Sequence, residues 1–240
     1  MTLAVATARR VLAQLRHDHR TVALILVLPC LVVGIIAWMF EGTPVLDQFG
    51  PVAVGFFPLF VMFLVTSVTT QRERSSGTLE RLMTTPLRKG DLVAGYALAF
   101  GGLALLQALV VVGFAVWVGM DVAGALGLVV LVALLDAVLG SSLGLAASAV
   151  ARTEFQAVQM MPAVIVPQLL TCGLLMPRDQ MPEVLEWVSR VLPLTYAVEA
   201  LQQLAAGLGW ADVRGAVGVV VLWIVGSVVL GMLTLRRRTE

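Results

Sequence analysis

Apolar residues are grouped along the chain into six long runs that are separated by shorter polar segments. A helix needs about 20 apolar residues to cross the hydrocarbon core of a bilayer, and each run is close to or above that length. The fifth run contains Pro162 and Pro167, which a transmembrane helix tolerates because neighbouring helices satisfy the backbone groups that proline leaves free. The pattern therefore predicts an all-α integral membrane protein, with a single transmembrane domain over residues 1–240 and six spans at 21–40, 52–70, 92–118, 122–150, 155–176 and 216–235.

Residues 1–20 follow a different pattern, in which a helix would carry apolar residues on one face and polar residues on the other. The apolar face holds Val5, Ala8, Val11, Leu12 and Leu15. The polar face holds Arg9, Arg10, Gln14, Arg16, His17 and Arg20. This arrangement predicts an amphipathic helix that lies in the membrane surface, in contact with lipids, before the first span begins.

The overall composition supports the same class of protein. Hydrophobic residues make up 59% of the chain and charged residues only 13%, whereas a soluble domain carries about a quarter of its residues as charged ones. The net charge of +1 gives no reason to expect binding to nucleic acid. Cys30 and Cys172 lie in apolar runs without a CxxC spacing, and we interpret both as buried free thiols.

Basic residues are divided unequally between the two sides of the predicted membrane domain. Four arginines precede the first span, five basic residues lie in segment 72–91, and Arg152 and the three arginines after the last span fall on the same side. Only Arg178, Arg190 and Arg214 fall on the other side. Because cytoplasmic loops collect Lys and Arg, this distribution predicts a multi-pass protein of the bacterial plasma membrane with cytoplasmic N and C termini.

The segment 72–91, with the sequence RERSSGTLERLMTTPLRKGD, carries eight charged residues between two apolar runs. Within it, Leu79, Leu82 and Met83 have the i, i+3, i+4 spacing of an amphipathic helix, and Pro86 would end that helix. A solvated loop that obeyed only the charge rule would need Lys and Arg alone. The acidic residues between the arginines instead favour a short cytoplasmic helix that docks on a protein partner.

Two stretches of the chain resemble the signatures of type-2 ABC exporter permeases. RERSSGTLERLMTTPLRKGDLVAGY is similar to the segment after the second helix in that family, in which R-E-x-x-x-G-T-x-E-x-L-x-x-T-P recurs. LLTCGLLMPRDQMPEVLEWVSRVLPLTYAVEALQQL is similar to a second signature that ends in P-L-T-Y-A-x-E-A-L. The motifs occur in the family's order and, with the six spans, the resemblance covers most of the chain. Cys172 and Gln202 depart from it, at positions where Ser and Arg are common.

The resemblance implies roles for the matching positions. The helix that couples to an ATPase would hold the matched residues of segment 72–91 and the apolar stripe beside them, namely Arg72, Glu73, Gly77, Thr78, Leu79, Glu80, Leu82, Met83 and Pro86. The interfacial helix would be the connecting helix next to it, with Arg9, Arg10, Arg16 and Arg20. A partly re-entrant extracellular helical hairpin over 177–215 would be shaped by Pro177, Met181, Pro182, Pro193, Tyr196 and Glu199.

The chain has no motif for binding nucleotide. A P-loop needs G-x-x-x-x-G-K-[ST], and the single lysine, Lys89, is followed by Gly90 and Asp91. His17 and His19 occupy i, i+2 positions, which do not face each other on a helix, so we expect no metal site there. The chain is therefore not expected to be an enzyme or to bind a cofactor, and ATP and Mg would bind to a partner ATPase.

A few polar and small residues fall inside the predicted spans. Exposure of Asp136 to lipid would cost several kcal/mol, so this residue lies either in a translocation path or in a hydrogen bond between helices. Gln107 is a second candidate for the path, although an interhelical hydrogen bond explains it more simply. Gly140 and Gly144 predict close helix packing, either within the chain or between two copies.

Together these features predict the membrane permease of an ATP-driven ABC exporter, assembled as a homodimer or heterodimer with two ATPase subunits. Its substrate would be hydrophobic or amphipathic, such as a drug, an antibiotic or a lipid, and it would leave the cytoplasm or inner leaflet by alternating access. The alternative is an ion- or proton-coupled secondary transporter that uses Asp136 as a relay. A neighbouring reading frame with a P-loop would favour the exporter.

Overall fold

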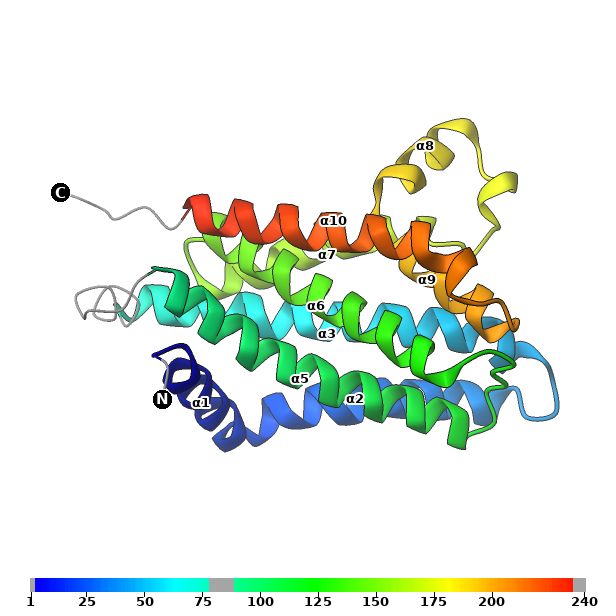
Figure 1. Cartoon of the computed structure of the whole chain (residues 1–240), viewed down its shortest axis with the longest axis horizontal. Helices are drawn as coiled ribbons and strands as arrows, with labels where there is room; N and C mark the ends of the chain where they lie inside the picture. The colour runs from blue at the N-terminus through cyan, green and yellow to red at the C-terminus, as the bar shows by residue number, and fades with distance from the viewer. Residues whose placement is uncertain (1–2, 78–88, 235–240) are drawn as a thin grey trace.

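The computed structural model describes residues 3–77 and 89–234, and over these residues it contains helices and no strands (Figure 1). The all-α prediction is thereby confirmed. The helices are α1 (Leu3–His17), α2 (His19–Met39), α3 (Val45–Ser75), α5 (Lys89–Trp117), α6 (Leu126–Val150), α7 (Glu154–Thr171), the short 3-10 helix η1 (Arg178–Gln180), α8 (Glu183–Val191), α9 (Pro193–Ala205) and α10 (Trp210–Thr234).

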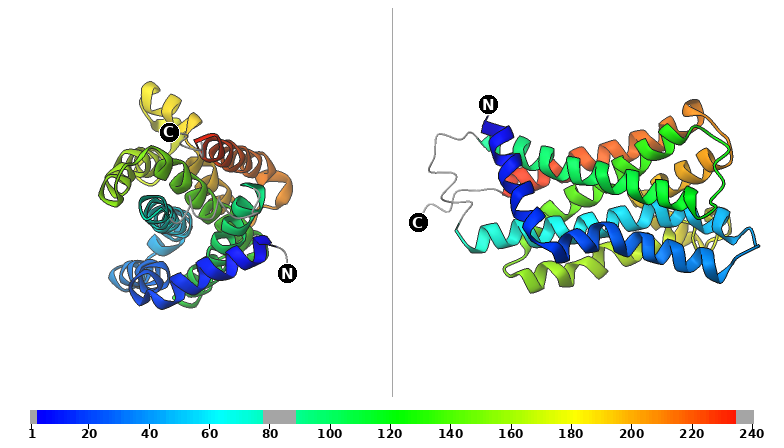
Figure 2. Two further views of the ribbon diagram at one scale, coloured as in Figure 1. Left: turned by 90° about the vertical axis from the view of Figure 1, so that its left-hand side faces the viewer. Right: turned by 90° about the horizontal axis from the view of Figure 1, so that it is seen from below.

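The long helices run along one common axis and form a bundle (Figure 1). Helix α1 crosses that axis at one end of the bundle, where α3 and α10 also end, whereas α8 and α9 lie at the opposite end (Figures 1 and 2). Five helical segments are long and apolar enough to cross a membrane, namely Thr21–Met39, Val45–Ser75, Ala94–Trp117, Leu126–Val150 and Trp210–Gly231. The chain is therefore a multi-pass membrane protein.

Helix α7 covers the region of the predicted fifth span but is not among the five segments that are long and apolar enough to cross a membrane. It is 18 residues long, begins with Glu154 and contains three glutamines in addition to Pro162 and Pro167. It ends at Thr171, before the predicted limit at residue 176, and the chain then turns at Gly173, which has a φ of 95°. A left-handed conformation of this kind favours glycine and stops the helix. The described residues therefore do not confirm a sixth span.

Other helix bounds differ from the predicted spans for local reasons. The expected helix over residues 1–20 is divided at Asp18, whose carboxylate accepts a hydrogen bond from the Thr21 amide and caps α2. An Asp side chain at an N-cap accepts a hydrogen bond from a backbone N–H group that has no acceptor within the helix. Helix α3 exceeds the predicted 52–70 at both ends, and α10 begins at Trp210 rather than at residue 216.

The centre of the bundle is α3, which packs most extensively against α6. A Cβ atom on Gly140 would overlap the carbonyl oxygen of Leu59, and one on Gly144 would lie 2.5 Å from the carbonyl oxygen of Phe63. Such close approach of two backbones requires glycine at both positions. The two glycines predicted to serve helix packing therefore pack within the chain. The residues around this contact form the core that holds α3 in place.

Candidate functional site

The end of α3 is held between α1 and α7 by two ion pairs. The guanidinium of Arg10 contacts both carboxylate oxygens of Glu73, at 3.0 and 3.4 Å. The guanidinium of Arg72 donates two hydrogen bonds to Glu154 on α7, at 3.1 and 3.2 Å. Successive residues of a helix point in different directions, so Arg72 and Glu73 reach different neighbours. The Arg72–Glu154 pair is bidentate, the geometry that fixes a guanidinium most firmly.

The two ion pairs differ in burial. The side chain of Glu73 is only 7% exposed and that of Arg10 is 28% exposed, whereas Arg72 and Glu154 are 62% and 40% exposed. Breaking a buried ion pair is costly because it leaves one buried charge without a counter-ion. An exposed ion pair contributes little to the free energy of folding. The sequence pattern predicted that Glu73 would lie on a surface that docks a partner protein. The structure instead pairs the Glu73 carboxylate with Arg10 of the same chain.

Helix α1 is docked on α5 through a small contact surface. Thr7, Ala8 and Val11 are buried, and a Cβ atom on Gly95 of α5 would lie 2.5 Å from the Thr7 Cβ and 2.9 Å from the Ala4 carbonyl oxygen. The predicted apolar face of α1 is thus divided, since Val5 and Leu12 are 43% and 37% exposed. Arg9 and Arg16 are exposed as well, and the side chains of Leu15 and Arg20 lie outside the described residues.

The predicted coupling residues are described only in part. Gly77 follows the end of α3 with a φ of 68°, and its amide donates to the Arg74 carbonyl, as is typical of a glycine that ends a helix. Thr78, Leu79, Glu80, Leu82, Met83 and Pro86 lie outside the described residues. Their assignment to a docking helix therefore remains a prediction.

Asp136 and Gln107, the two candidates for a translocation path, lie on neighbouring helices and differ in their hydrogen bonding. Asp136 on α6 is completely buried, and neither of its carboxylate oxygens has a hydrogen-bond partner among the described residues. Gln107 on α5 is also completely buried, and its amide donates to the carbonyl oxygen of Ile25 on α2 at 3.1 Å. Gln107 thus forms the interhelical hydrogen bond that its position predicts. The two carboxylate oxygens of Asp136 could therefore still accept hydrogen bonds.

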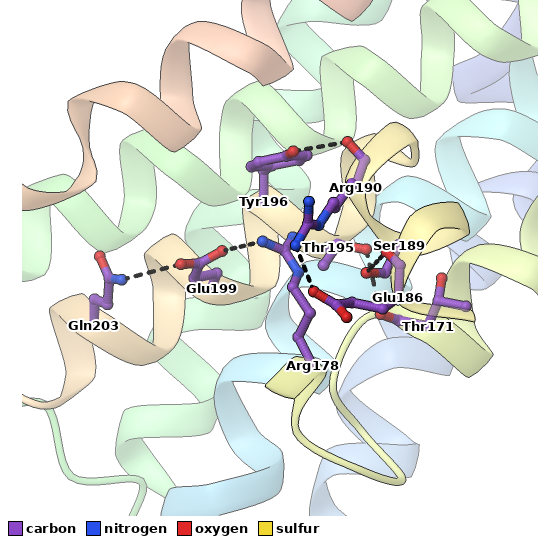
Figure 3. Close-up of polar contacts among 9 residues, drawn as sticks. All are labelled: Thr171, Arg178, Glu186, Ser189, Arg190, Thr195, Tyr196, Glu199 and Gln203. Carbon is purple, nitrogen blue, oxygen red and sulfur yellow. Dashed lines mark hydrogen bonds and ion pairs between the residues drawn. The ribbon is translucent and has the colours of Figure 1, made fainter. Parts of the chain in front are cut away.

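The hairpin at the other end of the bundle is attached to one face of α9 (Figure 3). Arg178 of η1 forms an ion pair with Glu199 at 3.5 Å, and its guanidinium lies 5.0 Å from the centre of the Tyr196 ring. The Tyr196 hydroxyl donates to the Arg190 carbonyl oxygen of α8 at 2.7 Å. Glu199 also accepts a hydrogen bond from Gln203. Tyr196 and Glu199 therefore hold both short helices of the hairpin.

The prolines of the hairpin stand where helices begin. Pro177 precedes η1, Pro182 precedes α8, and Pro193 is the first residue of α9. Proline suits these positions because it has no amide hydrogen and its φ is already helical. Between them, Met181 is buried with 9% of its surface exposed. The residues that the family signature singled out thus determine where the hairpin helices start.

Helix α8 turns its polar side toward the protein. Ser189 is its one buried residue and donates to the Glu186 carbonyl oxygen, and the Glu186 carboxylate pairs with Arg190 at 2.6 Å. The apolar residues of the helix are exposed, namely Val184, Leu185, Trp187, Val188 and Val191. Its amphipathic character was visible in the sequence, but the direction of the apolar side was not.

Several residues that hold these two regions together carry no strong signal in the sequence. Glu154 and Arg178 were not singled out, although each pairs with a predicted residue. Gln168 of α7 was also missed, and its side-chain oxygen accepts a hydrogen bond from the amide of Leu194 in the first turn of α9. A charged or amide residue within an apolar stretch is the signal that could have drawn attention to Gln168. Within the described ranges, no group of three His, Cys, Asp or Glu side chains could hold a metal ion.

A bundle of long apolar helices, with an ion-paired amphipathic helix at one end and a small helical hairpin at the other, defines a multi-pass membrane protein. The model of the ABC-2 type transporter family matches residues 2–205, and the chain belongs to this family. Its homologues are ABC transporter permeases, the membrane subunits that work with ATPase partners. The predicted resemblance is confirmed.

Three relatives illustrate the range of this similarity. The chain is 32% identical over 180 residues to ABC transporter G family member 20 of Dictyostelium discoideum, covering 73% of this chain and 25% of that protein. It is 30% identical over 175 residues to Nodulation protein J of Rhizobium leguminosarum bv. trifolii, covering 70% and 64%. It is 26% identical over 189 residues to Linearmycin resistance permease protein LnrN of Bacillus subtilis (strain 168), covering 77% and 49%. The chain thus spans less than two thirds of each relative.

Proposed function

We propose that the chain is the transmembrane subunit of an ATP-driven exporter of hydrophobic or amphipathic molecules, such as drugs, antibiotics or lipids. The observation that carries this proposal is the match of the ABC-2 type transporter family over residues 2–205. Relatives with names that include linearmycin resistance and multidrug transport support the class of substrate. Alternating access would move the substrate from the cytoplasm or inner leaflet to the outside.

In the proposed topology, α7 also crosses the membrane, as the fifth of six spans in chain order, and both termini are cytoplasmic. The start of α1 and the end of α10 lie toward the same end of the bundle, as an even number of crossings requires (Figure 1). The concentration of arginines in and near this end supports its placement on the cytoplasmic side of a bacterial plasma membrane. The glutamines and prolines of α7 are acceptable in a span that faces protein or water rather than lipid.

The ion pairs at the end of α3 suggest how movement of a partner would reach the membrane helices. Segment 72–91 would receive the movement from an ATPase subunit that binds ATP and Mg. Since Glu73 is paired with Arg10 and Arg72 with Glu154, displacement of the end of α3 would act on both α1 and α7. Two permease copies, identical or similar, would work with two ATPase subunits.

A double truncation in the proposed docking helix tests this function. Leu82→Ala with Met83→Ala should release a co-expressed ATPase subunit or leave it hydrolysing ATP without transport, because apolar anchors usually carry most of the binding energy of an interface. Glu80→Arg should weaken coupling by reversing one charge of the contact. Co-purification of the ATPase and substrate transport in membrane vesicles are the two measurements.

The matched control truncates two apolar residues at the opposite end of the molecule. Val184→Ala with Val188→Ala removes exposed side chains from α8 and should leave binding of the ATPase unchanged. If the variant with Leu82→Ala and Met83→Ala also keeps normal binding and transport, segment 72–91 is not the docking element and the proposal fails at that step.

A secondary transporter that uses Asp136 is the competing function, because this carboxylic acid is buried without a partner among the described residues. Asp136→Asn keeps the shape of the side chain and removes its ionisation. The exporter proposal predicts that transport continues to require ATP and keeps its pH dependence in this variant. The alternative would be supported by two results together. An ion gradient would drive transport by the unmodified chain, and the Asp136→Asn variant would lose both this drive and the pH dependence of transport.

A further inference from the structure

Helix α1 exposes two residues of its predicted polar face together with two residues that the sequence pattern placed on its apolar face. Val5, Arg9, Leu12 and Arg16 are all exposed. Because these residues follow one another at spacings of four, three and four, they lie along one side of the helix. They are distinct from the buried contact with α5. We call this set the arginine face of α1.

The arginine face has a positive charge that the described part of the chain does not neutralise. Helix α1 contains no acidic residue, since its sequence is LAVATARRVLAQLRH. Arg10 is paired with Glu73, but neither Arg9 nor Arg16 forms an ion pair with any of the side chains that the structure describes. Two such guanidinium groups that alternate with the apolar side chains of Val5 and Leu12 suit a surface that offers anions and hydrocarbon at the same depth.

The position of α1 places this face at the edge of the membrane. Only Asp18 separates α1 from α2, in which the apolar span begins at Thr21. The helix runs across the long axis of the bundle rather than along it (Figure 2). Only 17% of the most apolar part of α2 is buried within the chain, so an apolar surface is exposed directly beside the end of α1. The arginine face therefore lies next to an exposed apolar surface of α2.

We propose that the arginine face of α1 binds anionic phospholipids of the inner leaflet. Arg9 and Arg16 contact the lipid phosphates, while Val5 and Leu12 enter the boundary between headgroups and acyl chains. This inference rests on the proposed cytoplasmic location of α1. Charge complementarity with the anionic inner leaflet favours lipid over a protein surface as the occupant, because the apolar residues between the arginines have hydrocarbon available at that depth.

The test compares phosphatidylglycerol with phosphatidylcholine on the detergent-purified full-length chain, by native mass spectrometry over a lipid titration. At low salt, Arg9→Gln and Arg16→Gln should each weaken phosphatidylglycerol binding about fivefold, and together about thirtyfold, from about 1 kcal/mol per basic residue. Binding of phosphatidylcholine should change little. The double replacement by Lys, which keeps the charge, should restore most of the preference.

Two controls distinguish a lipid site on α1 from a general loss of positive charge and from a simple phosphate site. Arg214→Gln removes an exposed arginine from α10 at the other end of the bundle and should leave the phosphatidylglycerol preference unchanged. Soluble glycerol phosphate should not compete with the lipid, because it lacks the acyl chains that Val5 and Leu12 contact. Successful competition would overturn the proposal by showing that phosphate alone is bound.

The proposal is also overturned if the Gln variants keep the preference for phosphatidylglycerol but lose co-purification of the ATPase subunit, because the face would then be a protein contact. Lipid binding is measured on the permease chain alone. Its failure therefore leaves the proposed exporter function intact, and failure of the Leu82 and Met83 experiment leaves the lipid result intact.

Discussion

Helices α1 and α8 are amphipathic helices at opposite ends of the bundle, and they turn opposite kinds of face toward it. Helix α1 buries Ala8 and Val11 against α5, whereas α8 buries Ser189 and leaves Val184 74% exposed. In both helices the spacing of apolar residues shows that the helix has one apolar face and one polar face. It does not show which of these faces meets the rest of the protein. The neighbouring element decides between them, since α5 offers a close apolar contact and α9 offers polar groups.

The two attachments also differ in the energy that holds them. Helix α1 is fixed by apolar packing and by the buried Arg10–Glu73 pair, whereas α8 is fixed by the Tyr196 hydroxyl. Burial makes the loss of a partner costly, and exposure to solvent reduces that cost. We therefore expect the α1 end to respond more strongly to mutation than the hairpin.

The largest effect is expected for Arg10→Ala, because this change leaves the buried Glu73 carboxylate without its counter-ion. Loss of one partner of a buried pair costs about 3 kcal/mol. Glu73→Ala should cost only about 1 kcal/mol, because the partly exposed Arg10 can reach water. Denaturant unfolding in detergent micelles measures both. Equal losses from the two variants would show that the burial difference between the partners does not govern this contact.

The next largest effect is expected where α1 crosses α5. Gly95→Ala should destabilise the chain by about 2 kcal/mol, because the new methyl group would overlap Thr7 and Ala4. Gly101→Ala is the matched control in the same helix, where no atom lies within 4 Å of the new methyl group. It should stabilise α5 by about 0.5 kcal/mol through helix propensity. Thermal unfolding of both variants gives the comparison, and a similar loss at the two sites would argue against the crossing.

A smaller effect is expected from two tyrosines that lie at the two ends. Tyr196→Phe removes the hydroxyl that holds α8 and should cost about 1 kcal/mol, while the ring stays beside Arg178. Tyr96→Phe should be close to neutral, because the Tyr96 hydroxyl is buried without a partner in the described ranges. Hydrogen exchange should increase in α8 for the first variant alone. Unchanged exchange there would mean that the hydroxyl does not hold the hairpin.

The smallest effect is expected for Val184→Ser on the exposed side of α8. In detergent this change should alter the free energy of unfolding by less than about 0.5 kcal/mol, as surface substitutions usually do. The same substitution at the completely buried Val11 should cost about 2 kcal/mol, from lost apolar burial and an added hydroxyl. If the two substitutions cost the same, then α8 is covered by protein in the detergent-solubilised state.

Much of the fold could be predicted from local sequence. Long apolar runs predicted the five helices that can span a membrane, because hydrophobic length is a property of contiguous residues. Helix ends were less predictable, as Asp18 and Gly173 show. The fifth run was harder still, because the glutamines of α7 lower its apolar character and its suitability as a span depends on what those side chains face.

Less of the candidate site could be predicted. The resemblance pointed to Arg72, Glu73, Tyr196 and Glu199, and to Arg10 in the connecting helix. It did not point to Glu154 or Arg178, and it did not indicate which residues pair. Arg72 and Glu154 are 82 positions apart along the chain, and Arg10 and Glu73 are 63 apart. No periodic pattern connects residues at such separations. The docking residues from Thr78 to Pro86 lie outside the described ranges, so their role is still a prediction.

The sequence by itself determined the class of this protein, its helical character and its family, because these depend on hydrophobic runs and short motifs that are complete within neighbouring residues. Only the tertiary structure decided which face of α1 and α8 meets the protein, which charges are already paired, and that Asp136 is buried without a partner among the described residues. The physical reason is that burial and pairing are properties of two surfaces, and the second surface comes from a distant part of the chain.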